Sequence, residues 1–220
     1  MEKIRTVIWD CDGVIWKNEE NLQIVAKKLE IANYKEFSEQ CYEFFDAFLD
    51  YFKNKKANMG KMLQIADETM PILGLHSVSP EIFLKALNDA KLETIKFNED
   101  AIIVMKYLQT KGIKNIIKTD WWREAQEIVL KHYGVLDYIE ELHCCDDAYL
   151  KTNPNSAIGL IKKGKEDTYL IIGDSLKCDI AFAEHAHIKS IWFNPNNTPN
   201  KTQLNPTFEV TSLLEVIDII

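Results

Sequence analysis

Short apolar runs alternate with helical patterns over the second half of this 220-residue chain, and this alternation restricts the possible fold more than any other feature. The expected helices cover residues 100–111, 123–132, 154–163 and 176–185. The expected strands cover residues 113–118, 138–143, 168–172 and 189–193, with a last short one near Phe208 and a helix from Thr211. Because strands separated by such helices form βαβ units, the sequence predicts a parallel sheet in an α/β fold.

The N-terminal segment TVIWDCDGVIW places two acidic side chains directly after another apolar run. A buried strand of an α/β sheet has such a run, and ligands bind beyond the carboxyl ends of these strands. Two carboxylates at Asp10 and Asp12 repel each other by roughly 4 kcal/mol at ~4 Å and an effective dielectric of ~20. The pair therefore suggests a neutralising cation or a shared proton. On its own, however, the segment is equally compatible with a helix cap or a turn, because Asp-Gly favours turns.

Residues 17–93 differ from the rest of the chain, because they contain several helical patterns and no convincing strand. Ser79-Pro80, for example, is typical of a helix start. We expect an α/β core domain made of residues 1–16 and 94–220, with residues 17–93 inserted as a helical cap domain. The chain would cross between these units near residues 16–17 and 94–98, where a hinge could let the cap close over the strand ends.

Composition excludes several classes of function. The net charge is −8 and there is no Lys/Arg block, so binding to a nucleic acid is not expected. No apolar run approaches the ~20 residues of a membrane span, and MEKIRTVIWD does not resemble a signal peptide. We therefore expect a cytoplasmic protein without a membrane partner. Five cysteines without CxxC spacing suggest neither a disulfide framework nor a zinc site. The sequence does not indicate the oligomeric state.

Polar residues also follow three later strand patterns. They are Thr119, Lys151, Asp174, Ser175 and Asp179. Each is weak evidence alone, since Asp and Ser commonly cap helices and an isolated lysine is usually on the surface. In a parallel sheet, however, these strand ends open at one edge, so we expect the residues to converge on the acidic pair.

Taken in order, these motifs resemble those of the haloacid dehalogenase (HAD) superfamily of phosphohydrolases. Asp10-Cys11-Asp12-Gly13 matches the first motif, DxDG, and Thr119 matches the second. Lys151 matches the third, and Gly173-Asp174-Ser175 with Asp179 matches the fourth, GDSxxxD. The resemblance implies a Rossmann-like parallel sheet core with an inserted all-helical cap of the C1 type.

The resemblance also implies the chemistry of the site. Asp10 would attack phosphorus and form an aspartyl-phosphate, which divides hydrolysis into two steps. Asp12 would protonate the leaving group and then activate water. Thr119 and Lys151 would bind the phosphoryl oxygens as charge develops, and Lys151 thereby takes part in catalysis.

A magnesium ion is the implied cofactor, since Mg²⁺ prefers hard oxygen ligands and accepts a phosphate oxygen. Its ligands would come from Asp10, Asp12 and Asp174, and in the family the Asp12 ligand is the backbone carbonyl. Asp179 and Ser175 would support the site, with Asp179 orienting Lys151 or a metal-bound water.

The function indicated is that of a Mg²⁺-dependent phosphatase acting on a small phosphorylated metabolite, with specificity set by the cap. A phosphomutase differs mainly in the acceptor of the phosphoryl group and stays an alternative. A 2-haloacid dehalogenase is a second alternative, although halide leaves without a proton and needs neither Asp12 nor a metal. A third is a regulatory α/β domain phosphorylated at Asp10 without turnover.

Two motifs depart from the family pattern. Asp120, Trp121 and Trp122 follow Thr119. Asp120 adds negative charge near a phosphate site, which is unfavourable unless it points away. The two tryptophans could face the substrate or cover the sheet edge, and the covering role is the one we expect for at least one of them. Lys151 is followed by Thr-Asn-Pro instead of Pro-x-Pro, but Pro154 should still start a helix.

Overall fold

The structure is a computed structural model and describes residues 3–19, 21–52, 59–71 and 78–220. Its centre is a six-stranded parallel sheet with the strand order β5-β4-β1-β6-β7-β8. The strands are β1 (Thr6–Trp9), β4 (Lys114–Lys118), β5 (Glu141–His143), β6 (Tyr169–Gly173), β7 (Lys189–Phe193) and β8 (Phe208–Val210). The expected α/β fold with a Rossmann-like parallel sheet is therefore confirmed.

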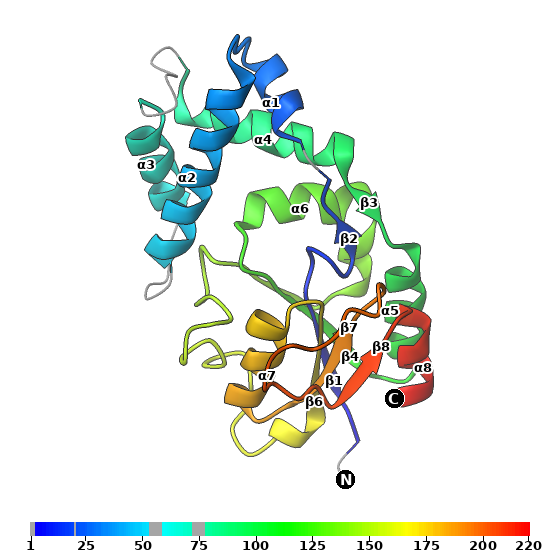
Figure 1. Cartoon of the computed structure of the whole chain (residues 1–220). Coiled ribbons are helices and arrows are strands. Elements are labelled where there is room, and N and C mark those ends of the chain that lie inside the picture. Colours follow the sequence, from blue (N-terminus) through cyan, green and yellow to red (C-terminus); the bar gives the residue numbers. More distant parts are fainter. Residues whose placement is uncertain (1–2, 20, 53–58, 72–77) are drawn as a thin grey trace.

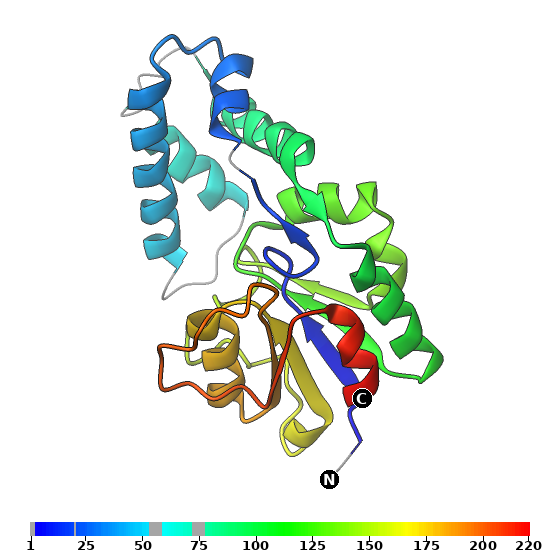
Figure 2. The same cartoon turned by 45° about the vertical axis from the view of Figure 1, so that its right-hand side comes forward.

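Helices cover both faces of this sheet. On one side lie α5 (Glu99–Thr110), α6 (Arg123–His132) and α8 (Val216–Ile219), and on the other side lies α7 (Ala181–Ala186) (Figures 1 and 2). Side chains of β1 alternate between the two cores: Val7 and Trp9 pack toward the first layer and Ile8 toward the second. Because β1 lies between β4 and β6, all its residues are buried, which explains the unbroken apolar run before Asp10.

Two sequence predictions about local structure need correction. The strand expected over residues 138–143 is only Glu141–His143, because a 3₁₀ turn, Val135–Tyr138, follows Gly134. The helix expected over residues 154–163 is wrong, since the chain there forms successive turns. Gly159 has a left-handed φ of +83°, and the Asn153 side chain accepts a hydrogen bond from the backbone N–H of Asn155. Both features compete with a continuous helix.

The described residues between 17 and 93 are largely helical, as expected. The helices are α1 (Leu22–Lys28), α2 (Tyr34–Phe52), α3 (Met59–Thr69) and α4 (Pro80–Thr94). Helix α4 begins as predicted, because Ser79 accepts a hydrogen bond from the backbone N–H of Ile82 and Pro80 occupies the first turn. The core of these helices includes Phe83 and extends onto Trp122 and Ala125 at the start of α6.

The insert is joined to the sheet by a short antiparallel ribbon of β2 (Trp16–Lys17) and β3 (Lys96–Phe97). The two crossings expected in the sequence are thus paired with each other, separately from the six-stranded sheet. Both views place α1–α4 beyond the end of the sheet toward which β1 points (Figures 1 and 2). The division into a core domain and a cap domain stays a prediction. Among the described residues, no helix has the length and apolar character needed to cross a membrane.

Candidate functional site

Three neighbouring strands bring the predicted site residues together. Strands β4, β1 and β6 end side by side, and they lead directly into Thr119, Asp10 and Asp174. A pocket of about 420 Å³ lies at this edge, and its lining includes Asp10, Asp12, Thr119, Lys151 and Ser175. The predicted convergence of the strand ends is therefore present in the structure.

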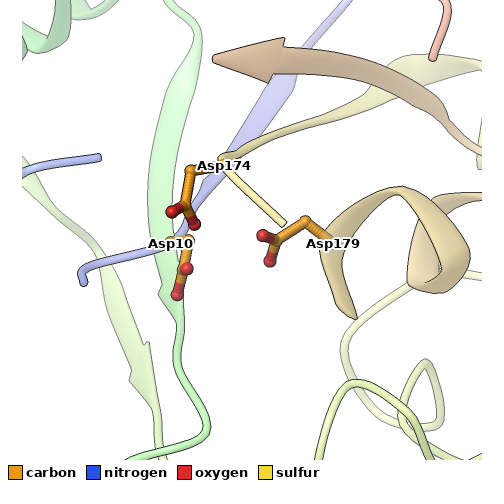
Figure 3. Close-up of side chains that lie close together, drawn as sticks. All are labelled: Asp10, Asp174 and Asp179. Carbon is orange, nitrogen blue, oxygen red and sulfur yellow. The ribbon is translucent and has the colours of Figure 1, made fainter. Parts of the chain in front are cut away.

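The Asp10 carboxylate, which lines this pocket, forms a cluster with those of Asp174 and Asp179. One oxygen from each lies within 4.8 Å of the others, and the Asp179 side chain points toward the other two (Figure 3). Asp10 and Asp179 are buried, whereas Asp174 is exposed. Partial burial and the charge of Asp179 raise the pKa of Asp174 to about 6, although Lys151 acts in the opposite direction. The cluster therefore holds more negative charge than its surroundings neutralise.

Lys151 is the cation at the centre of this cluster. Its Nζ atom lies 2.7 Å from Asp10 Oδ1 and 2.5 Å from Asp179 Oδ1, and its side chain is only 3% exposed. Burial favours the neutral amine, but the charges of Asp10 and Asp179 raise the pKa of Lys151 well above its usual value. Burial raises the pKa of Asp10 strongly, against the opposing effect of Lys151. The contact between Asp179 and Lys151 corresponds to one of the two roles that the family resemblance implies for Asp179.

Two glycines allow the acidic side chains to approach so closely. A Cβ atom at Gly13 would overlap the carboxylate of Asp174, and one at Gly173 would overlap the side chain of Asp179. Gly13 also has a φ of +92°, which disfavours any other residue. Ser175 fixes Asp179 through a 2.9 Å hydrogen bond from its backbone N–H to Asp179 Oδ2. The glycines of the first and fourth motifs thus have a direct packing role.

The Asp12 carboxylate faces a different set of partners. It accepts hydrogen bonds from Trp16 Nε1 at 2.8 Å, Asn18 Nδ2 at 2.6 Å, Lys91 Nζ at 2.9 Å and Gln126 Nε2 at 2.8 Å. Burial alone would raise its pKa, but the Lys91 charge and the hydrogen bonds lower the pKa of Asp12 to about 2. This carboxylate does not belong to the cluster of Asp10, Asp174 and Asp179. Its role as a metal ligand through the backbone carbonyl stays a prediction.

Lys91 and Gln126 are site residues that the sequence analysis missed. Both are buried, and each lies on a helix whose neighbouring turns are apolar: Leu87 precedes Lys91 by four residues, and Val129 follows Gln126 by three. A lysine or glutamine on the apolar side of a helix is uncommon and was the available signal. The sequence gives no indication, however, that these two helices meet at Asp12.

The hydroxyl of Thr119 is prepared to donate a hydrogen bond into the pocket. Its oxygen accepts from Gln126 Nε2 at 2.8 Å and from the backbone N–H of Trp121 at 3.3 Å. Because a hydroxyl has two acceptor positions and one proton, the proton is left for a further acceptor. This arrangement fits a residue that binds an anionic oxygen.

Asp120 also lies on the lining of this pocket, but its carboxylate is engaged by neighbouring groups. Its Oδ1 atom accepts a 2.8 Å hydrogen bond from the backbone N–H of Lys151 and lies 3.6 Å from Lys118 Nζ. Lys118 is fully buried; burial lowers its pKa, and the charge of Asp120 partly offsets this effect. Asp120 therefore fixes the backbone of Lys151 and is paired with a cation.

The two tryptophans have separate positions. Trp122 is buried in the core formed by the inserted helices and the beginning of α6, so it packs there and does not line the pocket. Trp121 is half-buried and lines the pocket together with Phe45 of α2. The centroids of these two rings are 5.7 Å apart, and the ring planes are tilted by 45°. The pocket lining thus contains both acidic side chains, such as Asp10 and Asp12, and the aromatic rings of Phe45 and Trp121.

Two curated proteins have sequences related to part of this chain. The pyrimidine 5′-nucleotidase PynA of Streptococcus pneumoniae is 33% identical over 95 residues, which are 40% of this chain and 39% of that protein. The HAD-hydrolase YfnB of Bacillus subtilis is 28% identical over 118 residues, which are 52% of this chain and 46% of that protein. The chain therefore matches less than half of the length of these curated relatives.

Solved structures of low sequence identity share the fold over nearly the whole chain. The crystal structure of YfnB bound to magnesium has a TM-score of 0.70 at 19% identity, covering 99% of each chain. A 2-haloacid dehalogenase from Pseudomonas syringae pv. Tomato has a TM-score of 0.68 at 17% identity, covering 98% of this chain and 97% of that one. The sequence model of the haloacid dehalogenase-like hydrolases matches residues 4–187. With its motifs assembled at the strand ends and this match over most of its length, the chain belongs to the haloacid dehalogenase-like hydrolase family.

Proposed function

We propose that this hydrolase is a Mg²⁺-dependent phosphatase that forms an aspartyl-phosphate on Asp10. Residues 1–16 and 94–220 would form its core domain and residues 17–93 its cap domain. The observation that supports this most is the buried Asp10 carboxylate, which has Lys151 at 2.7 Å and shares its pocket with a second carboxylate, Asp12. A nucleophile and a separate acid/base are what two-step hydrolysis of a phosphomonoester requires.

In the first step, a carboxylate oxygen of Asp10 attacks phosphorus, and the bond from phosphorus to the ester oxygen breaks. For this step Asp12 has to be protonated, against the effect of the neighbouring Lys91 charge, and it then gives its proton to that oxygen, so the alcohol leaves neutral. In the second step, Asp12 takes a proton from water, whose oxygen attacks the phosphorus of the aspartyl-phosphate. Inorganic phosphate leaves and Asp10 is restored. Thr119 donates its hydroxyl proton to a phosphoryl oxygen, and the Lys151 ammonium offsets the developing charge.

The residues present fit a hard divalent cation. Three carboxylate oxygens lie within 4.8 Å of one another, and among the described residues Lys151 is the cation that pairs with this cluster, through Asp10 and Asp179. Asp10 and Asp174, with the backbone carbonyl of Asp12, would hold Mg²⁺, which prefers oxygen ligands. When bound, the metal would supply positive charge to the phosphoryl oxygens. The crystal structure of YfnB bound to magnesium is consistent with this assignment.

The substrate that the pocket fits best is a nucleoside monophosphate. The pocket of about 420 Å³ exceeds what a phosphate group occupies, and its wall contains Trp121 and Phe45. Base–aromatic stacking contributes about 1–3 kcal/mol for each base. Asn18 and Asn21 lie on the same lining and can hydrogen-bond to a base or sugar. The similarity to a pyrimidine 5′-nucleotidase supports the same substrate class.

A substrate panel tests this function against the alternatives. Nucleoside 5′-monophosphates, glycerol phosphate and glucose phosphates are incubated with the enzyme in Mg²⁺ or in EDTA, and 2-chloropropionate is included. We expect phosphate release in Mg²⁺ alone, highest for a nucleoside monophosphate. Chloride release in EDTA would instead indicate a dehalogenase, and interconversion of glucose phosphates a mutase. Stable phosphorylation of Asp10 by acetyl phosphate, without turnover of any ester, would indicate a regulatory domain.

A further inference from the structure

We propose that Lys91 is a positioning residue for Asp12, and that Gln126 completes the support. This inference rests on the proposed function, because it assigns Lys91 a role in the acid–base step. Lys91 lies on α4 of the insert, 79 residues from Asp12 in the sequence, yet its Nζ atom is 2.9 Å from Asp12 Oδ1. The side chain of this lysine is 9% exposed, so the ion pair is largely withdrawn from solvent.

The position of the Lys91 ammonium is determined by several contacts. Besides Asp12, it donates to Gln126 Oε1 at 3.1 Å, and it lies 5.2 Å from the centre of the Trp16 ring. Trp16 itself donates from Nε1 to Asp12 Oδ1 at 2.8 Å. A buried lysine requires such compensation, because an unpaired buried charge is strongly unfavourable. The ammonium therefore has a defined place beside Asp12.

Gln126 fixes the second oxygen of Asp12 and links it to the phosphate site. Its Nε2 atom donates to Asp12 Oδ2 and to Thr119 Oγ1, each at 2.8 Å. The opposite orientation of the amide would place its oxygen against the Asp12 carboxylate and its N–H groups against Lys91. The charges on both sides therefore determine the orientation of the amide. With both oxygens engaged, the plane of the Asp12 carboxylate is fixed relative to Thr119.

This arrangement joins the insert to the chemistry of the core. Asp12, Thr119 and Gln126 follow or belong to elements of the sheet unit, whereas Lys91 comes from α4. The carboxylate keeps this set of partners only while α4 lies in its present place. Lys91 favours the ionised form of Asp12, so the role proposed for it is to orient this carboxylate and not to keep it protonated. An acid/base group must be within hydrogen-bond reach of the leaving oxygen, so its orientation affects the rate directly. Lys91 would thus act through Asp12 rather than on phosphorus.

The test uses leaving groups that differ in their need for a proton. Lys91→Met is compared with Lys85→Met, which changes an exposed lysine on the same helix that pairs with Asp89. Single-turnover release is measured with 4-nitrophenyl phosphate and with a nucleoside 5′-monophosphate. Because general acid catalysis contributes about 10²–10⁴-fold, we expect Lys91→Met to lose at least ~10-fold with the nucleotide. Nitrophenolate leaves without a proton, so its release should change less than ~3-fold, and Lys85→Met should match the wild type.

Further variants separate positioning from the other roles that Lys91 could have. Lys91→Arg keeps the charge and should recover part of the nucleotide rate, whereas Gln126→Met should reproduce the selective loss even if Lys91→Met does not fold. Because Lys91 acts through Asp12, adding Lys91→Met to Asp12→Asn should cause no further loss.

Four results would overturn the proposal. Equal losses with both leaving groups in folded protein would show a structural role. A further loss on top of Asp12→Asn, with a raised KM, would show that Lys91 binds substrate. If Lys91→Met released both leaving groups as fast as an active wild type, the role of Lys91 would be refuted but the proposed function would stand. A wild type that releases neither leaving group would refute the proposed function, and this role with it.

Discussion

Replacing Gly13 by alanine should disturb the carboxylates that we propose to bind Mg²⁺, with little other effect on the fold. The backbone at Gly13 has a φ of +92°, and an added Cβ would overlap the Asp174 carboxylate. Gly112 provides a matched control, because its φ is +69° and a Cβ there would have no atom within 4 Å. Both substitutions strain the backbone, but Gly13→Ala alone displaces a side chain of the site.

The expected magnitudes follow from these two differences. Left-handed backbone costs a non-glycine residue roughly 1–2 kcal/mol, so Gly112→Ala should lower the free energy of unfolding by that amount. For a chain of this size, the corresponding fall in Tm is about 2–8 °C. Gly13→Ala should show at least this strain. In addition, displacement of Asp174 should weaken Mg²⁺ affinity or activity by roughly 10–100-fold, as changes beside metal ligands commonly do.

Thermal unfolding and Mg²⁺ titration of phosphatase activity measure the two effects separately. We expect Gly112→Ala to fall in Tm while keeping the wild-type Mg²⁺ requirement. Gly13→Ala should need a higher Mg²⁺ concentration for half-maximal activity. The reasoning would be refuted if Gly13→Ala lost stability like Gly112→Ala but kept both turnover and the wild-type Mg²⁺ requirement.

Other outcomes follow from the same site. Asp10→Asn should lower kcat by at least ~10³-fold in phosphatase assays, since the nucleophile is lost; near-normal turnover in pure protein would contradict the role of Asp10. EDTA should abolish phosphate release and added Mg²⁺ should restore it, because Lys151 alone does not balance three carboxylates; full activity in EDTA would argue against a metal. Trp121→Ala should lower kcat/KM for a nucleoside monophosphate by about 5-fold or more while leaving glycerol phosphate little changed. Equal effects on both substrates would show that Trp121 does not contact the base.

The sequence predicts those parts of the site that depend on the ends of strands. Strand β1 is buried on both faces, so its apolar run is visible in the sequence and ends where Asp10 begins. The same holds for β6, which ends in Gly173 directly before Asp174. Because parallel strands end at one edge, their order along the chain is sufficient to predict that these residues converge.

Contacts between distant helices are less accessible to sequence reasoning. Lys91 and Gln126 meet Asp12 only because α4 packs against the beginning of α6. Local patterns define which face of each helix is apolar, but not which helices meet. The error over residues 154–163 has another cause: Pro154 favours a helix start, whereas Gly159 and the Asn153 side chain favour turns. The local preferences for helix and for turns conflict over these residues, so Pro154 alone is not sufficient to predict a helix.

The most direct test of the account is to trap the covalent intermediate on Asp10. Asp12→Asn protein is incubated with a nucleoside monophosphate or 4-nitrophenyl phosphate in Mg²⁺, quenched in acid and analysed by peptide mass spectrometry. Because Asp12 is needed to activate water in the second step, we expect a phosphoryl group to accumulate on Asp10 and to be missing in an Asp10→Asn control. Full steady-state turnover by Asp12→Asn, with Asp10 unmodified throughout, would contradict the aspartyl-phosphate mechanism.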